Sequence, residues 1–195
     1  MPYFYARIVS NMVKSSTFFL DIVKIVIIAL IIIIPIRFFV VQPFFVRGAS
    51  MEPTYSQGDY LLVDEISYRF SEPDRGDVII FRAPTGESQF FIKRVIGLPG
   101  ETVRVAGGEV LIINDAFTDG FVLGEEYIGN SITGNLETTL NENEYFMLGD
   151  NRGASFDSRA WGPLEHDLII GKVFLRAWPF GDFGLIDTPQ YETGR

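Results

Sequence analysis

The chain has 195 residues, enough for one modest domain and one additional segment. Hydrophobic residues make up 47% and charged residues 21%, so we expect a packed core rather than a disordered chain. The net charge of −9 argues against nucleic acid as a partner. There is no cysteine and only one histidine, His166, which excludes disulfides, thiolate sites and histidine-rich metal sites.

The first patterned segment is an apolar run at residues 25–36 that contains no polar side chain. Apolar neighbours extend it to residues 18–41, long enough for a helix that crosses a bilayer. Asp21 and Lys24 interrupt its first turns, and Pro35 would kink or end the helix. A cleaved signal peptide is the alternative, but no small-x-small cleavage site follows the run closely. We therefore predict one uncleaved transmembrane helix at residues 18–41.

The charges predict how this helix is oriented. Residues 1–41 carry a net charge of +3 and the rest of the chain carries −12. Arg7 and Lys14 precede the apolar run, so residues 1–17 should form a short cytoplasmic N-terminus. The acidic remainder should then be extracytoplasmic, in a single-pass protein of the cell (plasma) membrane.

The rest of the chain is typical of short strands separated by turns. Val, Ile and Phe dominate its apolar segments, with Gly, Pro, Asn and Asp between them. This predicts a mainly β, compact sandwich- or barrel-like domain over residues 42–187. Residues 118–143 should form an irregular loop excursion and residues 188–195 a loose tail. The expected strands are Tyr60–Ile66, Asp77–Arg82, Phe90–Ile96, Thr102–Val105, Glu109–Ile113, Glu144–Leu148 and Asp167–Trp178.

Ser50 follows the apolar run by about a dozen residues, in the segment Gly48-Ala49-Ser50-Met51-Glu52-Pro53-Thr54. A serine hydroxyl becomes a strong nucleophile only when a base removes its proton. His166 is one candidate base, but its place between two acids before an expected strand is more typical of a solvated surface histidine. A lysine is the other candidate.

After the apolar run the chain contains two lysines, Lys93 and Lys172. A lysine acts as a base at neutral pH only if burial lowers its pKa by several units. Lys93 shares a strand face with Phe91 and Val95, which suits burial, although an edge-strand lysine that prevents aggregation is an equally good interpretation. Lys172 lies in a similar strand, so strand position alone does not choose between the two.

A third polar segment extends from Gly149 to Pro163, directly after an apolar strand. It is rich in small hydroxyl side chains and in paired charges. It is either an ordinary loop with Asx turns and surface ion pairs or one wall of an active site.

Four blocks of this sequence, together with the N-terminal apolar segment, make the chain resemble bacterial type I signal peptidases (leader peptidases), a serine/lysine-dyad family. They occur in the family's order and span nearly the whole chain. The blocks are Ser50-Met51-Glu52-Pro53-Thr54, Arg75-Gly76-Asp77-Val78-Ile79-Ile80-Phe81, Lys93-Arg94-Val95-Ile96-Gly97-Leu98-Pro99-Gly100-Glu101, and Gly149-Asp150-Asn151-Arg152 continuing to Ser155 and Asp157-Ser158-Arg159.

The resemblance implies a function and a set of site residues. The protein would cleave N-terminal signal peptides from exported preproteins after small-x-small motifs, through an acyl-enzyme and without cofactor or metal. Its partners would be preproteins and the lipid bilayer, and we expect a monomer. The implied roles are Ser50 as nucleophile and backbone oxyanion donor, Lys93 as general base, Ser155 as the residue orienting the lysine, Asp150 with Arg94 and Asp157 with Arg159 as bracing ion pairs, and Phe44, Val46, Phe91 and Ile92 as substrate-pocket residues.

One position departs from the pattern of many family members. They have a serine two residues before the nucleophile, whose hydroxyl helps to hold the oxyanion, and this chain has Gly48, as another branch does. Three other classes stay open on the sequence: a self-cleaving regulator of the repressor type, a membrane-bound processing peptidase of organelles, and a non-catalytic, membrane-tethered β domain that binds partners.

Overall fold

The computed structural model describes residues 18–33, 41–86, 89–189 and 191. The chain divides into two units, Met1–Val40 and Val41–Arg195. In the first unit, residues 18–33 form a helix, and most of its large apolar side chains are exposed. No helix within the described ranges is long and apolar enough to span a bilayer. Positions 1–17 and 34–40 of the expected cytoplasmic and transmembrane segments lie outside the described residues, and Val41 begins a strand instead.

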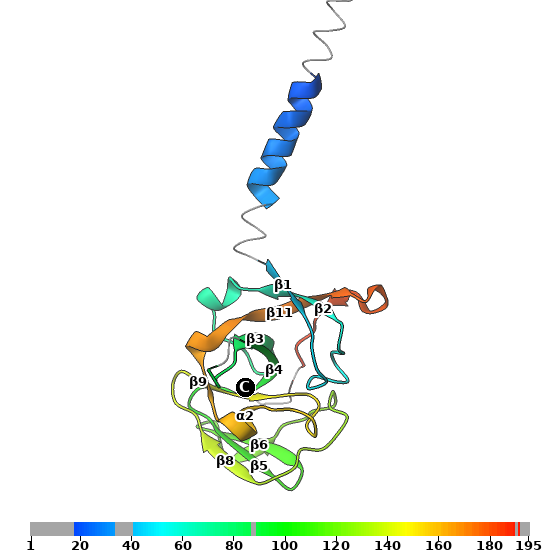
Figure 1. Ribbon diagram of the computed structural model, residues 1–195. Coiled ribbons are helices and arrows are strands. Elements are labelled where there is room, and N and C mark those ends of the chain that lie inside the picture. Colours follow the sequence, from blue (N-terminus) through cyan, green and yellow to red (C-terminus); the bar gives the residue numbers. More distant parts are fainter. Residues whose placement is uncertain (1–17, 34–40, 87–88, 190, 192–195) are drawn as a thin grey trace, which may run out of the picture. The chain divides into compact units, whose positions relative to one another are not determined.

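The second unit is mainly β, as predicted, and consists of two antiparallel sheets (Figure 1). The first sheet has the strand order β1-β2-β11-β3-β4-β9-β10, with β12 paired to β11. Its strands are β1 (Val41–Phe45), β2 (Tyr60–Asp64), β3 (Val78–Arg82), β4 (Phe90–Gly97), β9 (Glu144–Leu148), β10 (Leu164–Glu165), β11 (Ile169–Trp178) and β12 (Gly184–Leu185).

The second sheet has the order β7-β6-β5-β8. Its strands are β5 (Thr102–Ala106), β6 (Glu109–Asn114), β7 (Phe117–Val122) and β8 (Leu136–Thr139). The helical turns of this unit are short: η1 (Ser67–Arg69), α2 (Ser158–Trp161), η2 (His166–Leu168) and η3 (Phe180–Asp182).

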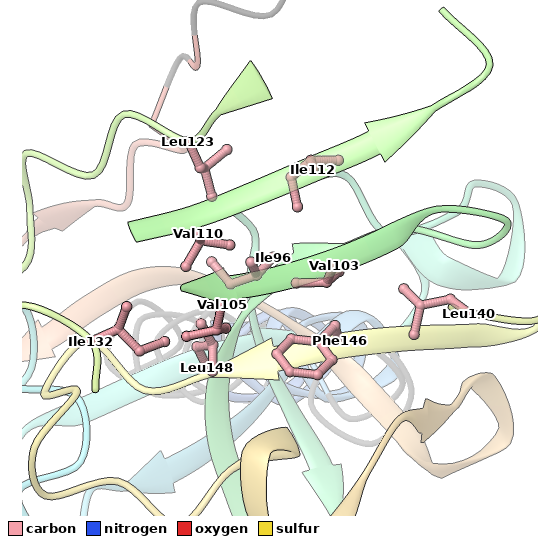
Figure 2. Close-up of a cluster of buried hydrophobic side chains, with 10 residues drawn as sticks. All are labelled: Ile96, Val103, Val105, Val110, Ile112, Leu123, Ile132, Leu140, Phe146 and Leu148. Carbon is pink, nitrogen blue, oxygen red and sulfur yellow. The ribbon is translucent and has the colours of Figure 1, made fainter. Parts of the chain in front are cut away.

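The strand sequences explain which faces are buried. In β5, Val103 and Val105 point into the core and alternate with exposed or half-buried residues, as expected for a sheet with one solvated face. β3 lies between β11 and β4 and is buried along most of its length, which matches its continuous apolar run. Figure 2 shows the core between the second sheet and strands β4 and β9. Its members are Ile96, Val103, Val105, Val110, Ile112, Leu123, Ile132, Leu140, Phe146 and Leu148.

The structure corrects two expectations. Residues 118–143 were expected to be irregular, yet they include most of β7 and all of β8. These strands alternate weakly between apolar and polar residues, and they are held by pairing with β6 and β5. The expected loose tail is also wrong at described positions: Thr188 donates a hydrogen bond to Asp77, and the hydroxyls of Tyr191 and Tyr127 share a hydrogen bond of 2.9 Å. Buried polar groups need such partners.

Candidate active site

Ser50 lies in a closed loop between β1 and β2. Backbone hydrogen bonds from Val46 N–H to the Asp59 carbonyl and from Gly58 N–H to the Val46 carbonyl join the two ends of the loop. Met51 and Tyr55, just after the serine, are buried in the core beneath β2. The residues after Ser50 therefore anchor this loop in the hydrophobic core.

Lys93 is a buried residue of β4, with 4% of its surface exposed. Its Nζ donates hydrogen bonds to Ser50 Oγ at 2.8 Å and to the Ile92 carbonyl at 2.9 Å. Burial lowers the pKa of Lys93 to about 8, although the carboxylates of Asp157 and Asp150 partly oppose that shift. The pair thus joins a serine hydroxyl to an amine that loses its proton more easily than an ordinary lysine.

The two competing bases lie elsewhere. Lys172 forms an ion pair with Asp77 at 2.5 Å. His166 Nε2 lies 3.6 Å from a Glu72 carboxylate oxygen, and its ring packs against Tyr145. Among the contacts of the described residues, neither Lys172 nor His166 meets Ser50. The structure therefore places Lys93, of the three candidates, at the serine hydroxyl.

The polar segment after β9 forms two ion pairs next to this lysine. Arg94, the neighbour of Lys93, makes a two-pronged contact with Asp150 at 2.9 and 2.6 Å and also donates to the Gly76 carbonyl. Burial opposes its charge, but the hydrogen bonds and charge of Asp150 outweigh this and raise the pKa of Arg94. Arg159 pairs with Asp157 at 2.8 Å, and Asp157 also accepts a hydrogen bond from the Gly149 N–H.

The expected bond between Ser155 and Lys93 is not formed. Ser155 Oγ is buried and has no hydrogen-bond partner among the residues that the structure describes. Its side chain packs against Gly149, so closely that a Cβ there would lie less than 3.0 Å from it. The hydrogen bonds of Lys93 go to Ser50 and to the Ile92 carbonyl instead.

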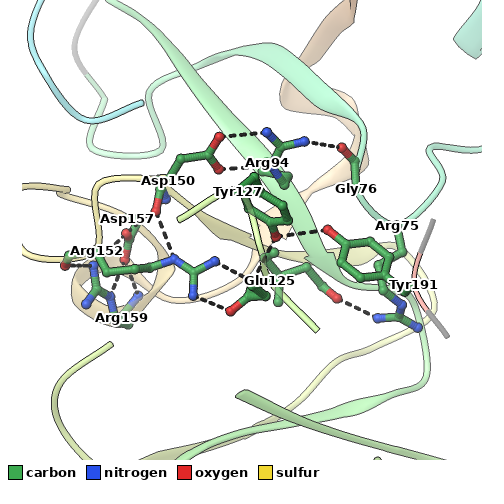
Figure 3. Close-up of polar contacts among 12 residues, drawn as sticks. Arg75, Gly76, Arg94, Glu125, Tyr127, Asp150, Arg152, Asp157, Arg159 and Tyr191 are labelled. Atoms are coloured by element: carbon green, nitrogen blue, oxygen red, sulfur yellow. Dashed lines mark hydrogen bonds and ion pairs between the residues drawn. The ribbon is translucent and has the colours of Figure 1, made fainter. Parts of the chain in front are cut away.

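Several residues around the site were missed by the sequence reasoning. Figure 3 shows Arg94 between Asp150 and Gly76, and the ring centroid of Tyr127 lies 4.2 Å from the guanidinium carbon. Arg152 makes a two-pronged ion pair with Glu125 and donates to the Gly149 carbonyl. Glu125 and Tyr127 lie in the stretch that was expected to be irregular, where nothing in the local sequence indicates a contact with the site.

A cleft of about 770 Å³ leads to the serine. All four expected pocket residues line it, and Phe90 and Phe156 extend its aromatic walls: Phe90 packs edge-on against Phe44, and Phe156 against Phe91. Within the described ranges, no group of three or more His, Asp or Glu side chains is placed to hold a metal ion.

The fold and site define an antiparallel β domain in which a cleft with aromatic walls ends at a hydrogen-bonded serine and lysine. Residues 19–178 match the family model described as signal peptidase, peptidase S26. Two proteins of Synechocystis sp. are similar: "Probable signal peptidase I-1" is 38% identical over 89% of this chain and 89% of that protein, and "Probable signal peptidase I-2" is 36% identical over 86% and 77%. A crystal structure of a signal peptidase I from Enterococcus faecalis aligns with a TM-score of 0.45 and 32% identity, covering 52% of this chain and 97% of that one.

The chain belongs to the signal peptidase family, peptidase S26. The resemblance stated from the sequence blocks is therefore confirmed, and the protein is a hydrolase of the protease class.

Proposed function

We propose that this protein is a membrane-anchored serine endopeptidase that removes N-terminal signal peptides from exported preproteins. The observation that carries the proposal is the 2.8 Å hydrogen bond between Lys93 Nζ and Ser50 Oγ, with the pKa of the lysine lowered by burial. The names of the relatives, signal peptidases, supply the substrate class.

The proposed reaction begins with neutral Lys93 as the general base. It takes the proton of Ser50 while Oγ attacks the scissile carbonyl, and the C–N bond then breaks as protonated Lys93 gives that proton to the leaving amine. The result is an ester between Ser50 and the signal peptide. Water, deprotonated by the same lysine, attacks the ester and releases the signal peptide with a carboxylate end, which restores the serine hydroxyl.

The oxyanion that forms during both attacks needs a donor. We assign this role to the backbone N–H of Ser50. Gly48 brings no hydroxyl, and a Cβ at this position would meet nothing within 4 Å, which leaves room for water. Loss of one oxyanion donor lowers kcat by about 10²–10³-fold in a serine protease, so the remaining donor carries much of the catalysis.

The cleft is proposed to receive the small side chains that precede the cleaved bond. Phe44, Val46, Phe91 and Ile92, which line the cleft, would contact these side chains. The ion pairs Arg94–Asp150 and Asp157–Arg159 would keep β4 and the segment after β9 in place. We propose a monomer that works without a cofactor or metal.

The membrane part of the proposal rests on the sequence. A helix that begins at residue 18 and ends before Val41, where β1 begins, would anchor the β domain on the extracytoplasmic side, with residues 1–17 in the cytoplasm. An enzyme and a signal peptide held in the same bilayer meet at a raised effective concentration. Preproteins and lipid are therefore the expected partners.

The test is cleavage of a preprotein with an Ala-x-Ala site by the full chain in detergent or vesicles. Ser50→Ala and Lys93→Ala should each lower the rate of cleavage by about 10³-fold or more, because the proposed nucleophile and general base work only together. Ser131→Ala, at an exposed position, is the matched control and should cleave normally. Lys93→His should recover part of the activity if any base at this position suffices.

Two outcomes would contradict the proposal. Full activity of Lys93→Ala would exclude this lysine as the base. Failure of an acylating serine-hydrolase inhibitor to label Ser50, read by mass spectrometry of the peptide that contains it, would favour the non-catalytic binding protein.

A further inference from the structure

Asn151 makes two contacts with the backbone on both sides of the Ser50 N–H. Its own backbone N–H donates to the Ser50 carbonyl at 3.1 Å, and its side-chain Nδ2 donates to the Ala49 carbonyl at 3.1 Å. These bonds join residues that are about a hundred positions apart in the sequence, from two loops of the site. Asn151 itself does not line the cleft, whereas Ala49 and Ser50 do.

These contacts determine the direction in which the Ser50 N–H, the assigned oxyanion donor, points. In a planar trans peptide, the C=O and the N–H point in opposite directions. Asn151 holds the Ala49 carbonyl on its own side, so the Ser50 N–H of the same peptide unit points away from Asn151. None of the residues that the structure describes accepts a hydrogen bond from that N–H.

We propose that Asn151 is a positioning residue, whose side chain orients the Ala49–Ser50 peptide so that the Ser50 N–H faces the oxyanion. The inference rests on the proposed function, because it needs Ser50 as nucleophile. It bears on the position where this chain has Gly48: without a hydroxyl donor there, the direction of one N–H matters more.

A second hydrogen bond to the Ala49 carbonyl limits how much kcat should fall when the Asn151 amide is removed. The Glu52 N–H donates to the same Ala49 carbonyl at 3.2 Å and closes a turn around the serine. Removing the Asn151 amide therefore loosens the peptide without releasing it. The loss in kcat should be about tenfold, smaller than the 10²–10³-fold seen when an oxyanion donor is removed outright.

The experiment uses the full chain with two substitutions. Asn151→Ala removes the amide, and Asn151→Asp keeps its shape but presents an acceptor to the Ala49 carbonyl; both keep the backbone N–H. We expect kcat for preprotein cleavage to fall about tenfold in Asn151→Ala, and at least as far in Asn151→Asp, with KM unchanged. Asn130→Ala and Asn130→Asp, at an exposed position, are the matched controls and should retain wild-type kinetics.

A second readout separates orientation of the oxyanion donor from general damage. A peptide aldehyde forms a tetrahedral adduct with a serine hydroxyl, so its affinity should fall by the same factor as kcat in Asn151→Ala. Binding of the uncleaved peptide to Ser50→Ala should not change when Asn151→Ala is added. The pH below which kcat/KM falls should also be the same as in the wild type, since none of the hydrogen bonds of Asn151 goes to Lys93.

Wild-type kcat in both Asn151 variants would overturn the inference, as would a rise in KM at constant kcat. An equal loss of affinity for the aldehyde and for the uncleaved peptide would also overturn it. So would a change in the pH below which kcat/KM falls. Each of these results leaves the proposed function intact if Ser50→Ala and Lys93→Ala are inactive. Full activity of Ser50→Ala would instead remove the proposed function and the inference together.

Discussion

Lys93 has an ionisable amine, yet it is buried, with 4% of its surface exposed. Burial disfavours the protonated form, which lowers the pKa from its ordinary value of 10.5 to about 8. The sequence showed apolar neighbours on the same strand face but left the alternative of an edge strand open. The structure excludes that alternative, because β4 lies between β3 and β9.

The lowered pKa predicts the pH dependence of cleavage. Below a pH of about 8, Lys93 is mostly protonated and has no lone pair to accept the serine proton. The value of kcat/KM should therefore rise about tenfold per pH unit in the acidic limb and level off above a pH of about 8. The measurement is the cleavage rate of a soluble peptide substrate against pH. His166→Ala should give the same profile, and a rate that is independent of pH would contradict the assignment of Lys93.

Gly149 is the residue at which the site tolerates no side chain. A Cβ there would lie less than 3.0 Å from Ser155 Oγ and from the Ser50 carbonyl, so the loop that contains Ser50 would have to move. Gly149→Ala should lower kcat by about 100-fold, the effect of a displacement on the order of 1 Å. Gly153→Ala in the same segment is the matched control, because a Cβ there meets nothing within 4 Å. Equal activity of the two variants would contradict this reading of the site.

At the scale of elements, the connection between β7 and β8 supports the site from outside. Glu125 in this connection pairs with Arg152, and the two side chains are 6% and 0% exposed. Arg152 in turn donates to the Gly149 carbonyl. A stretch that appears irregular in sequence thus braces the segment that holds Asp150 and Ser155.

This contact predicts a stability difference between two glutamate variants. Glu125→Ala leaves the buried Arg152 without its partner and should lower the free energy of unfolding by about 3–5 kcal/mol. Glu137→Ala removes an exposed ion pair with Arg104 and should change it by less than about 1 kcal/mol. Urea unfolding of both variants is the measurement. Similar midpoints for the two variants would show that Arg152 does not depend on Glu125.

The strands that were predicted and those that were missed differ in how they are stabilised. β4 and β9 begin at the predicted residues, because a run of Val, Ile, Phe and Leu in the local sequence predicts a buried strand. The apolar pattern predicts a helix that includes Val41, the first residue of β1. Pro43 is tolerated in this strand because β1 lies at a sheet edge. β8 is half polar and exists through pairing with β5, which no local pattern predicts.

At the scale of the whole molecule, the same buried lysine should reduce folding stability. The unfolded chain binds a proton at Lys93 up to a pH of about 10.5 and the folded chain only up to about 8, so stability rises with pH between these values. Below a pH of about 8 the full penalty is present, on the order of 3 kcal/mol from the size of the shift. If Lys93 is the proposed base, activity therefore requires a buried lysine that lowers the folding stability.

Lys93→Met tests this opposition in the full chain. Near neutral pH the inactive variant should be more stable than the wild type by up to about 3 kcal/mol, and the gap should close above a pH of about 10.5. Chemical unfolding of both proteins at several pH values gives the difference. A variant that is less stable than the wild type at neutral pH would contradict a desolvated lysine.

The sequence by itself determined the mainly β architecture and the family, and it named Ser50 and Lys93 as candidates, because strand periodicity and the four motif blocks are local properties of the chain. It also named the pairs Arg94–Asp150 and Asp157–Arg159, whose partners meet in the structure. The tertiary structure decided that Lys93 contacts the serine and that Ser155 packs against Gly149 instead of binding the lysine. It also decided that Glu125 and Tyr127 contact the arginines of the site and that Asn151 contacts the loop around Ser50. The physical reason is that burial and contacts between distant loops set both the pKa of Lys93 and the orientation of the backbone around Ser50, and neither quantity belongs to any one segment.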